Sequence, residues 1–436
     1  MTAARPAVPV PIRLPEEVLA QVDERLTATD ALLARAYPGE DGRRQPVHTV
    51  YVPADQYTTD LPHQWGSQAA ALVDQHGGID WLCAELGLPD DLAGEVAPKV
   101  TAKLDREPIE DLRLDFEDGY GARPDEIEDA DAVRVAGDLA KAIGEGTAPA
   151  FVGLRFKCLE EPTRRRGLRT LDLFLSTLLE AGPLPDRLQI TLPKVSTASQ
   201  VEAMVDVCTA YETAAGLSPG QLRFEIQVET PPLILSADGR AEIALALHAG
   251  DGRVTSLHYG TYDYSASLGV SAAYQSLAHP AADYAKEVMQ AAVAGTGVHL
   301  SDGSTNVLPI GTADQVRDAW RLHYSLVRRS LERAYYQGWD MHFGHLPTRF
   351  VANFAFYREG FTRATERLSA YLSKSESGVL DEPATARALA RYLHRGYSCG
   401  ALDDAELQAA VPLTADQLAE LSRPKSDTDN IAIRSG

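Results

Sequence analysis

The chain has 436 residues, of which 44% are apolar and 24% charged, so it is long and apolar enough to bury a large core. Its formal net charge of −21 argues against a nucleic-acid partner and against docking on an anionic membrane. The four cysteines lack metal-binding or redox spacing, and no apolar run reaches about 18 residues, so we expect a cytoplasmic protein without zinc site, disulfide frame, membrane span or signal peptide.

The N-terminal segment 1–45 is predicted to be an arm, with a Pro-rich lead and a helix over about 15–36. Residues 47–53 (VHTVYVP) form the first expected strand. A polar insertion follows at 54–108, with one amphipathic helix near 68–86. It leads into the second strand, LRLDFEDG (112–119), which breaks into an acidic turn.

Beyond this point predicted strands and helices alternate, which implies parallel strands joined by crossovers. Together with the first two, the strands number eight, as a (β/α)₈ TIM barrel needs, and we assign the barrel to residues 46–372. A doubly wound open sheet is the alternative, but it would need a Gly-rich phosphate loop after the first strand, and VYVPADQY contains none. The expected strands lie at 150–156, 188–192, 223–228, 254–260, 297–300 and about 334–341, and helices at 126–143, 168–179, 198–214, 281–294 and 313–331.

The C-terminal part is predicted to be helical. A last long helix is expected over about 348–372, followed by a segment at 373–378 with the composition of a flexible hinge. Short helices at 383–394, 403–411 and 414–421 would build a small extension, 373–422. The polar residues 423–436 are expected to be a disordered tail.

Two acids follow neighbouring predicted strands. Glu229 ends the strand FEIQVE just before two prolines, and Asp263 follows the next strand, SLHYG. In a barrel the carboxyl ends of the strands open on one face, so both carboxylates would point into one space. Mg²⁺ takes one or two carboxylates and leaves its other positions to water and substrate oxygens. Each acid could instead cap the next helix, but the repeated pattern favours a metal site.

Other strand ends offer further candidates. Asp115, Glu117 and Asp118 after the second strand could order metal-bound waters or a substrate-binding arginine, or could cap the next helix. Arg155 alternates with Gly153 on the third strand and is therefore expected to point inward. It suits bidentate capture of a substrate carboxylate, or a buried pair with one of the strand-two acids.

Three further features have less specific interpretations. Lys194, after the fourth strand, could form a Schiff base in a metal-free lyase, but beside the predicted metal ligands we favour a structural ion pair. The basic run RRRGLR (164–169) could attract a phosphate, although a solvated surface is preferred. His342 and His345 could exchange protons near the same mouth, but packed or capping histidines are more common, so neither is assigned a role.

These motifs resemble the citrate lyase beta-subunit-like family and its relatives, the malyl-CoA and citramalyl-CoA lyases, among the pyruvate/phosphoenolpyruvate-binding TIM barrels. The similarity covers roughly residues 47–395 and consists of VYVP, LDFEDGYG, GLRF, TLPKV, QVETPP and YGTYDYSASLG in this order. The resemblance implies that Glu229 and Asp263 hold Mg²⁺, with Mn²⁺ as an alternative, and that Arg155 anchors a carboxylate. Glu117 and Asp118 would be acids behind the metal ligands.

The segment GVLDEP (378–383) resembles the family's C-terminal segment, whose Asp acts as an acid–base group and can come from a neighbouring subunit. The resemblance implies that Asp381 is catalytic, that the extension is a lid over a neighbouring subunit, and that the chain is a homotrimer or hexamer. Helix capping is the alternative for Asp381, because a proline follows at the first helical turn.

The implied activity is that of a Mg²⁺-dependent carbon–carbon lyase or aldolase. It would act on a small carboxylate, a 2-oxo or 2-hydroxy acid or its CoA thioester, through a metal-stabilised enolate, with no permanently bound organic cofactor. One alternative keeps the barrel and changes the reaction, to malate-synthase-type acyl condensation, thioester hydrolysis or phosphoenolpyruvate chemistry. A second alternative is a non-enzymatic binding protein.

Overall fold

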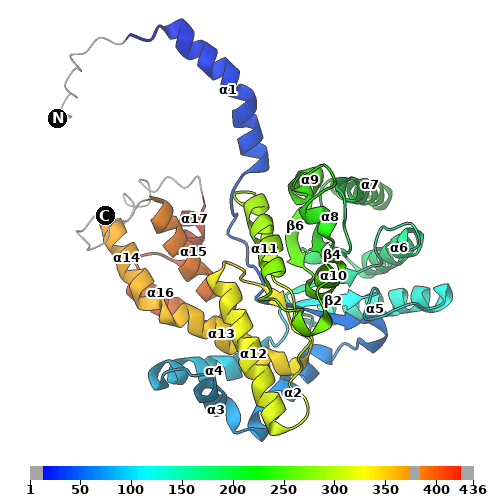
Figure 1. Cartoon of the computed structure of the whole chain (residues 1–436), viewed down its shortest axis with the longest axis vertical. Helices are drawn as coiled ribbons and strands as arrows, with labels where there is room; N and C mark the ends of the chain where they lie inside the picture. Colours follow the sequence, from blue (N-terminus) through cyan, green and yellow to red (C-terminus); the bar gives the residue numbers. More distant parts are fainter. Residues whose placement is uncertain (1–12, 374–382, 424–436) are drawn as a thin grey trace.

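The computed structural model describes residues 13–373 and 383–423, and its centre is an eight-stranded parallel sheet (Figure 1). The strand order is β7-β6-β5-β4-β3-β2-β1-β8, and a parallel bridge between Ser301 and Gln337 joins the two outer strands. The sheet is therefore rolled into a nearly closed (β/α)₈ barrel, which confirms the predicted fold. The strands are β1 (His48–Pro53), β2 (Asp111–Asp115), β3 (Phe151–Arg155), β4 (Leu188–Leu192), β5 (Phe224–Val228), β6 (Val254–Tyr259), β7 (His299–Ser301) and β8 (Gly338–Trp339).

Amphipathic helices surround the barrel. In α6, for example, Leu171, Phe174, Leu175 and Leu178 follow the helical repeat and are buried against the strands. The threonines before α7 and α12 each form a capping box with a glutamine three residues on, which fixes where these helices begin. The surrounding helices are α5 (Asp125–Glu145), α6 (Arg164–Ala181), α7 (Ala198–Ala215), α8 (Pro231–Ile234), α9 (Glu242–Ala249), α10 (Thr261–Ser267), α11 (Pro280–Val293) and α12 (Ala313–Glu332).

The insertion at 54–108 differs from the prediction. It forms three helices, α2 (Leu61–Gln75), α3 (Gly78–Glu85) and α4 (Asp90–Arg106), where the sequence predicted one over 68–86. Gly77 and Gly78 both have positive φ, which separates α2 from α3. The three helices pack on α13 (Leu346–Glu359) around a second apolar core, so the insertion is a folded layer of the molecule.

The predicted single helix over 348–372 is also wrong, because the structure has two helices, α13 and α14 (Phe361–Ser373). They are separated by Gly360, where a Cβ would clash with the ring of Tyr392. The Tyr392 hydroxyl donates to the carbonyls of Phe356 and Tyr357 at the end of α13. The helix therefore ends where a side chain from a later segment takes over its terminal carbonyls.

The C-terminal helices α15 (Pro383–Cys399), α16 (Asp404–Ala410) and α17 (Ala415–Leu421) share an apolar core with α14. At the other end of the chain, α1 (Glu16–Ala36) projects away from the barrel (Figure 1). Among the described helices, none combines the length and apolarity needed to cross a bilayer. Asp381, for which the resemblance implies a catalytic role, lies outside the described residues. So do residues 424–436, which make up most of the predicted tail.

The inside of the barrel is polar, which distinguishes it from a barrel filled with branched apolar side chains. Arg113, from the middle of β2, donates to Glu225 of β5 at 2.7 Å and also pairs with Asp111. Thr191 and Tyr51 donate to the same Glu225 carboxylate. In β2 to β5 the residues that alternate with these polar ones are apolar and belong to the main hydrophobic core, for example Leu112, Leu154 and Ile226. The buried charges thus form a rigid floor beneath the carboxyl ends of the strands.

Candidate active site

Glu229 follows β5 directly and is buried at the carboxyl-terminal face of the barrel. The backbone N–H of Lys194, beyond β4, donates to its Oε1 at 2.9 Å. Its side chain rests against Gly260, which follows β6, and a Cβ at that position would overlap Glu229. The glycine of the YGTYD motif is therefore needed for the close approach of the β5 carboxylate to β6.

The side chain of Lys194 forms ion pairs with the other three acids of the site. Its Nζ lies 2.7 Å from Glu117 Oε1, 2.7 Å from Asp118 Oδ2 and 3.0 Å from Asp263 Oδ2. Asp263 sits in the first turn of α10, and its side chain is 44% exposed. The structure thus brings together four of the five acids predicted for the site, from the ends of β2, β5 and β6, and the fifth, Asp381, lies outside the described residues. The ion pair favoured for Lys194 is confirmed.

The backbone of Lys194 has a φ of 53°, a left-handed conformation that is uncommon for a residue with a side chain. In this conformation its N–H reaches Glu229 while its side chain reaches the acids from β2 and β6. Such strain persists only where the surrounding structure enforces it, and it is frequent at functional sites.

The charged residues of the cluster differ in the direction in which their pKa values are shifted. Burial raises the pKa of Glu229 to about 7, although Lys194 and Arg155 oppose the shift. Burial also raises the pKa of Glu117, whereas for Asp118 the ammonium of Lys194 overcomes burial and lowers the pKa. Burial works against the charge of Lys194, but Glu229 and the other carboxylates raise its pKa. Lys194 is therefore an ammonium, and a Schiff base would need the neutral amine.

One edge of the Arg155 guanidinium is fully used by an ion pair with Asp115. Its Nε and Nη2 donate to Asp115 at 2.6 and 2.7 Å, and its guanidinium lies over the ring of Tyr51. The buried pair that was one alternative for this arginine is therefore present. Nη1 points to the other side and lies 3.7 Å from Glu117 Oε2 and 3.4 Å from Gln227 Oε1. Capture of a substrate carboxylate by Arg155 stays a prediction, and Nη1 is the group that would make it.

The cluster has the oxygen-ligand chemistry that a divalent cation prefers, and metal binding by it stays a prediction. Glu117, Asp118, Glu229 and Asp263 supply four carboxylates around the one ammonium of Lys194, which leaves excess negative charge. All four offer hard oxygen ligands, as Mg²⁺ and Mn²⁺ prefer. Glu229 and Asp263 are the pair predicted to hold the ion; Glu229 rests against Gly260, and Asp263 lies in the first turn of the helix that begins just after this glycine.

The raised pKa of Glu229 predicts a pH dependence of stability. The unfolded chain loses this proton near pH 4.5 and the folded chain near pH 7, so the folded state holds more protons between these values. The stabilisation, roughly 3 kcal/mol, is fully present below pH 4.5 and lost as the pH rises through about 7. We expect Glu229→Gln to flatten the loss of melting temperature between pH 5 and 8 in metal-free protein. An identical pH profile in the variant would contradict this assignment.

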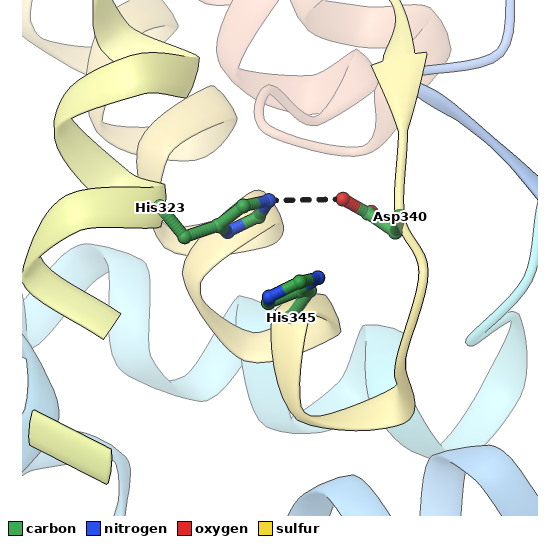
Figure 2. Close-up of side chains that lie close together, drawn as sticks. All are labelled: His323, Asp340 and His345. Carbon is green, nitrogen blue, oxygen red and sulfur yellow. Dashed lines mark hydrogen bonds and ion pairs between the residues drawn. The ribbon is translucent and has the colours of Figure 1, made fainter. Parts of the chain in front are cut away.

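A second group of potential ligands is buried elsewhere in the molecule (Figure 2). It consists of His323 of α12, Asp340 after β8 and His345 of the short helix η3 (Phe343–His345). The two imidazole rings are stacked, with centroids 4.3 Å apart and an interplanar angle of 10°. Nitrogen lone pairs lie in the ring plane, so parallel stacked rings do not point at one ion. Arg349 also donates to both oxygens of Asp340. His323 and Asp340 belong to a buried ion-pair network, His345 contacts the carbonyl of Val307, and the group is a poor metal site.

The basic run at 164–169 is the first turns of α6, where Arg166 and Arg169 both pair with Asp129 of α5. The run joins two neighbouring helices, and only part of it is a solvated surface. Neither the reason for Gly260 nor the contact of Arg155 with Tyr51 was predicted from the sequence. The sequence motifs TLPKV and YGTYD mark the ends of β4 and β6, but they do not show which side chains face one another.

No curated protein matches the chain in sequence. Among solved structures, a citrate lyase from Burkholderia xenovorans LB400 is 20% identical, with a TM-score of 0.55, over 86% of this chain and 97% of that chain. A malate synthase from Haloferax volcanii is 15% identical, with a TM-score of 0.47, over 90% and 98%. CitE from Mycobacterium tuberculosis, in complex with magnesium, acetoacetate and coenzyme A, is 16% identical, with a TM-score of 0.47, over 82% and 99%.

The likeness to the Burkholderia citrate lyase establishes that the two proteins share a fold, in agreement with the barrel described above. A family model described as "Domain of unknown function (DUF6986)" matches residues 26–426, which include the arm helix from its middle onward, the whole barrel and the C-terminal helices. The chain therefore belongs to the DUF6986 family.

Proposed function

We propose that the chain is a divalent-metal-dependent carbon–carbon lyase or aldolase that acts on a small 2-oxo or 2-hydroxy acid or its CoA thioester. The observation that supports it is the convergence of four carboxylates from β2, β5 and β6 at the carboxyl-terminal face of a barrel that shares its fold with a citrate lyase. This face carries the active site in TIM-barrel enzymes.

Each residue of the cluster has a distinct part in the proposal. Glu229 and Asp263 would hold Mg²⁺ or Mn²⁺, which would supply positive charge beside substrate oxygens as negative charge develops there. Lys194 keeps Glu117 and Asp118 in place through its two 2.7 Å contacts. Arg155 would orient the substrate carboxylate through Nη1, while Asp115 fixes its other edge.

Proton transfer is assigned to Asp381 by resemblance alone, and a water molecule is the alternative. Within the described residues, Glu117, Asp118 and Asp263 are held by Lys194, and Asp115 is held by Arg155. Glu229 is taken by the predicted metal site. A group from outside this cluster is therefore the better candidate for exchanging a proton with substrate.

A substrate panel tests the proposal. We expect Mg²⁺-dependent cleavage when oxaloacetate or malyl-CoA is offered, or condensation of pyruvate with an aldehyde, with loss of activity in EDTA and recovery with Mg²⁺. Turnover of acetyl-CoA with glyoxylate alone would assign malate-synthase-type condensation instead. Absence of all turnover, together with no Mg²⁺-dependent thermal shift, would leave a binding protein.

A further inference from the structure

The helix α1 has no buried residue along its 21 residues. Only its base is fixed: the N–H of Gly39 donates to Gly295 at 2.7 Å, and Tyr37 packs edge-on against His248. Figure 1 shows α1 extending from this point into solvent, away from α14 and α15. In proteins most of the stability of a helix comes from packing of its apolar face against another surface.

The large apolar side chains of α1 form a stripe along one face, which Arg25 and Thr29 interrupt. At 100° per residue they fall within an arc of about 140°, wider than a coiled-coil seam and typical of a helix that lies on a broader surface. They are 39–50% exposed, which is unusual for so many large apolar side chains in a row. The stripe consists of Val18, Leu19, Val22, Leu26, Leu32 and Leu33.

An acidic row borders this stripe. Glu16, Asp23 and Asp30 are spaced seven residues apart, nearly two full turns, so their carboxylates line up along one edge of the apolar face. With five acidic and two basic residues, α1 has a net charge of −3. A surface that matches it would combine an apolar floor with a positive rim.

Such a surface exists where α13, α14 and α15 meet. A groove of about 630 Å³ lies there, and its floor is apolar. On its rim, Arg363 is exposed and makes no ion pair with any residue in 13–373 or 383–423, whereas Arg328 is held by Glu359 at 2.6 Å. The floor is formed by Phe356, Ala364, Ala388, Leu389 and Tyr392.

We propose that α1 of one chain lies in the α13–α15 groove of a second copy of the same chain. The complementarity of the apolar stripe with the apolar floor, and of the acidic row with Arg363, carries the proposal. Recognition follows the helix-in-groove mode, with Val22, Leu26 and Leu33 as anchors at helical spacing. Exchange of such an arm between identical copies gives a symmetric assembly. The proposal is independent of the chemistry at the barrel mouth.

Substitutions in α1 of the full-length chain test the apolar part. We expect Val22→Gln with Leu26→Gln to shift the self-association measured by light scattering or sedimentation to at least tenfold higher protein concentration. Glutamine is a good helix former, so the helix itself should persist. The matched control, Ala20→Gln with Thr27→Gln, places the same side chains on the opposite face and should associate like the wild type.

A charge exchange tests the groove. Arg363→Glu and Asp23→Arg should each weaken association several-fold, and the two together should restore it in a mixed or double variant. Arg240→Glu makes the same charge change at an exposed position away from the groove and should have no effect.

Three results would overturn the proposal. The wild-type chain could be monomeric at all concentrations, in which case binding of α1 to phosphatidylcholine vesicles would assign its stripe to a lipid surface. The glutamine pair in the stripe could leave association unchanged, so that another face forms the assembly. Finally, the glutamine pair in the stripe could weaken self-association while Arg363→Glu, alone or combined with Asp23→Arg, leaves it unchanged. In that case α1 docks on a different surface.

Discussion

Replacing Glu229 by glutamine is expected to lower the kcat/KM of the proposed cleavage reaction by roughly 10³-fold. It should also abolish the rise in melting temperature on addition of Mg²⁺. Glutamine has nearly the same shape, so it can still rest against Gly260 and accept the N–H of Lys194 through its side-chain oxygen. It lacks the negative charge that a hard divalent cation requires. Steady-state kinetics and thermal shift with and without Mg²⁺ provide the measurements.

The fold should survive this substitution. Above pH 7 a charged, buried Glu229 is unfavourable in the metal-free protein, because burial raises its pKa to about 7, so the neutral glutamine should be at least as stable there. Glu202→Gln, at an exposed position of α7, makes the same chemical change away from the site and should leave turnover unchanged. Wild-type turnover in the Glu229 variant would remove the metal-dependent proposal.

The barrel and the acids at its mouth were accessible from the sequence because each depends on a local pattern. The alternation of strands and helices fixes the topology, and the rule that strands end on one face brings Glu229 and Asp263 to the same mouth. The sequence suggested an ion pair for Lys194 and a buried pair for Arg155, but the particular partners in these contacts were not accessible. The link through Lys194 depends on its φ of 53°, and the pairing of Arg155 with Asp115 depends on the register of β2 against β3.

The insertion and the last strand show the same limit. The helix α4 buries Val96, Val100 and Leu104 at helical spacing, yet the segment is polar overall because its other face is charged. Its burial depends on α13, about 250 residues further along the chain. Strand β8 pairs over only two residues, so the closure of the barrel relies on side chains that no strand pattern reveals.

Asp340 is the centre of that closure. It follows β8, and its N–H donates to the carbonyl of Thr49 in β1 at 3.1 Å. Its carboxylate lies 2.9 Å from His48 Nδ1 and 3.0 Å from His323 Nε2, and it accepts two N–H groups of Arg349. Burial would raise the pKa of Asp340, but Arg349 and the two histidines hold it well below its ordinary value. One buried carboxylate thus ties β8 to β1, α12 and α13.

Asp340→Ala is therefore expected to lower the free energy of unfolding by about 3–5 kcal/mol, because it leaves the buried guanidinium of Arg349 without its counter-charge. Urea unfolding followed by circular dichroism measures the loss, and Asp238→Ala, which breaks an exposed pair with Arg240, should cause no measurable change. Equal midpoints for the two variants would show that closure does not depend on this network.

If EDTA lowered the melting temperature of the Glu229→Gln variant but not of the Glu229→Gln, Asp340→Ala double variant, the His323–Asp340–His345 group would hold a metal after all. We expect EDTA to have no effect on either, because the lone pairs of stacked imidazoles do not converge on one ion and Arg349 already donates to both oxygens of Asp340.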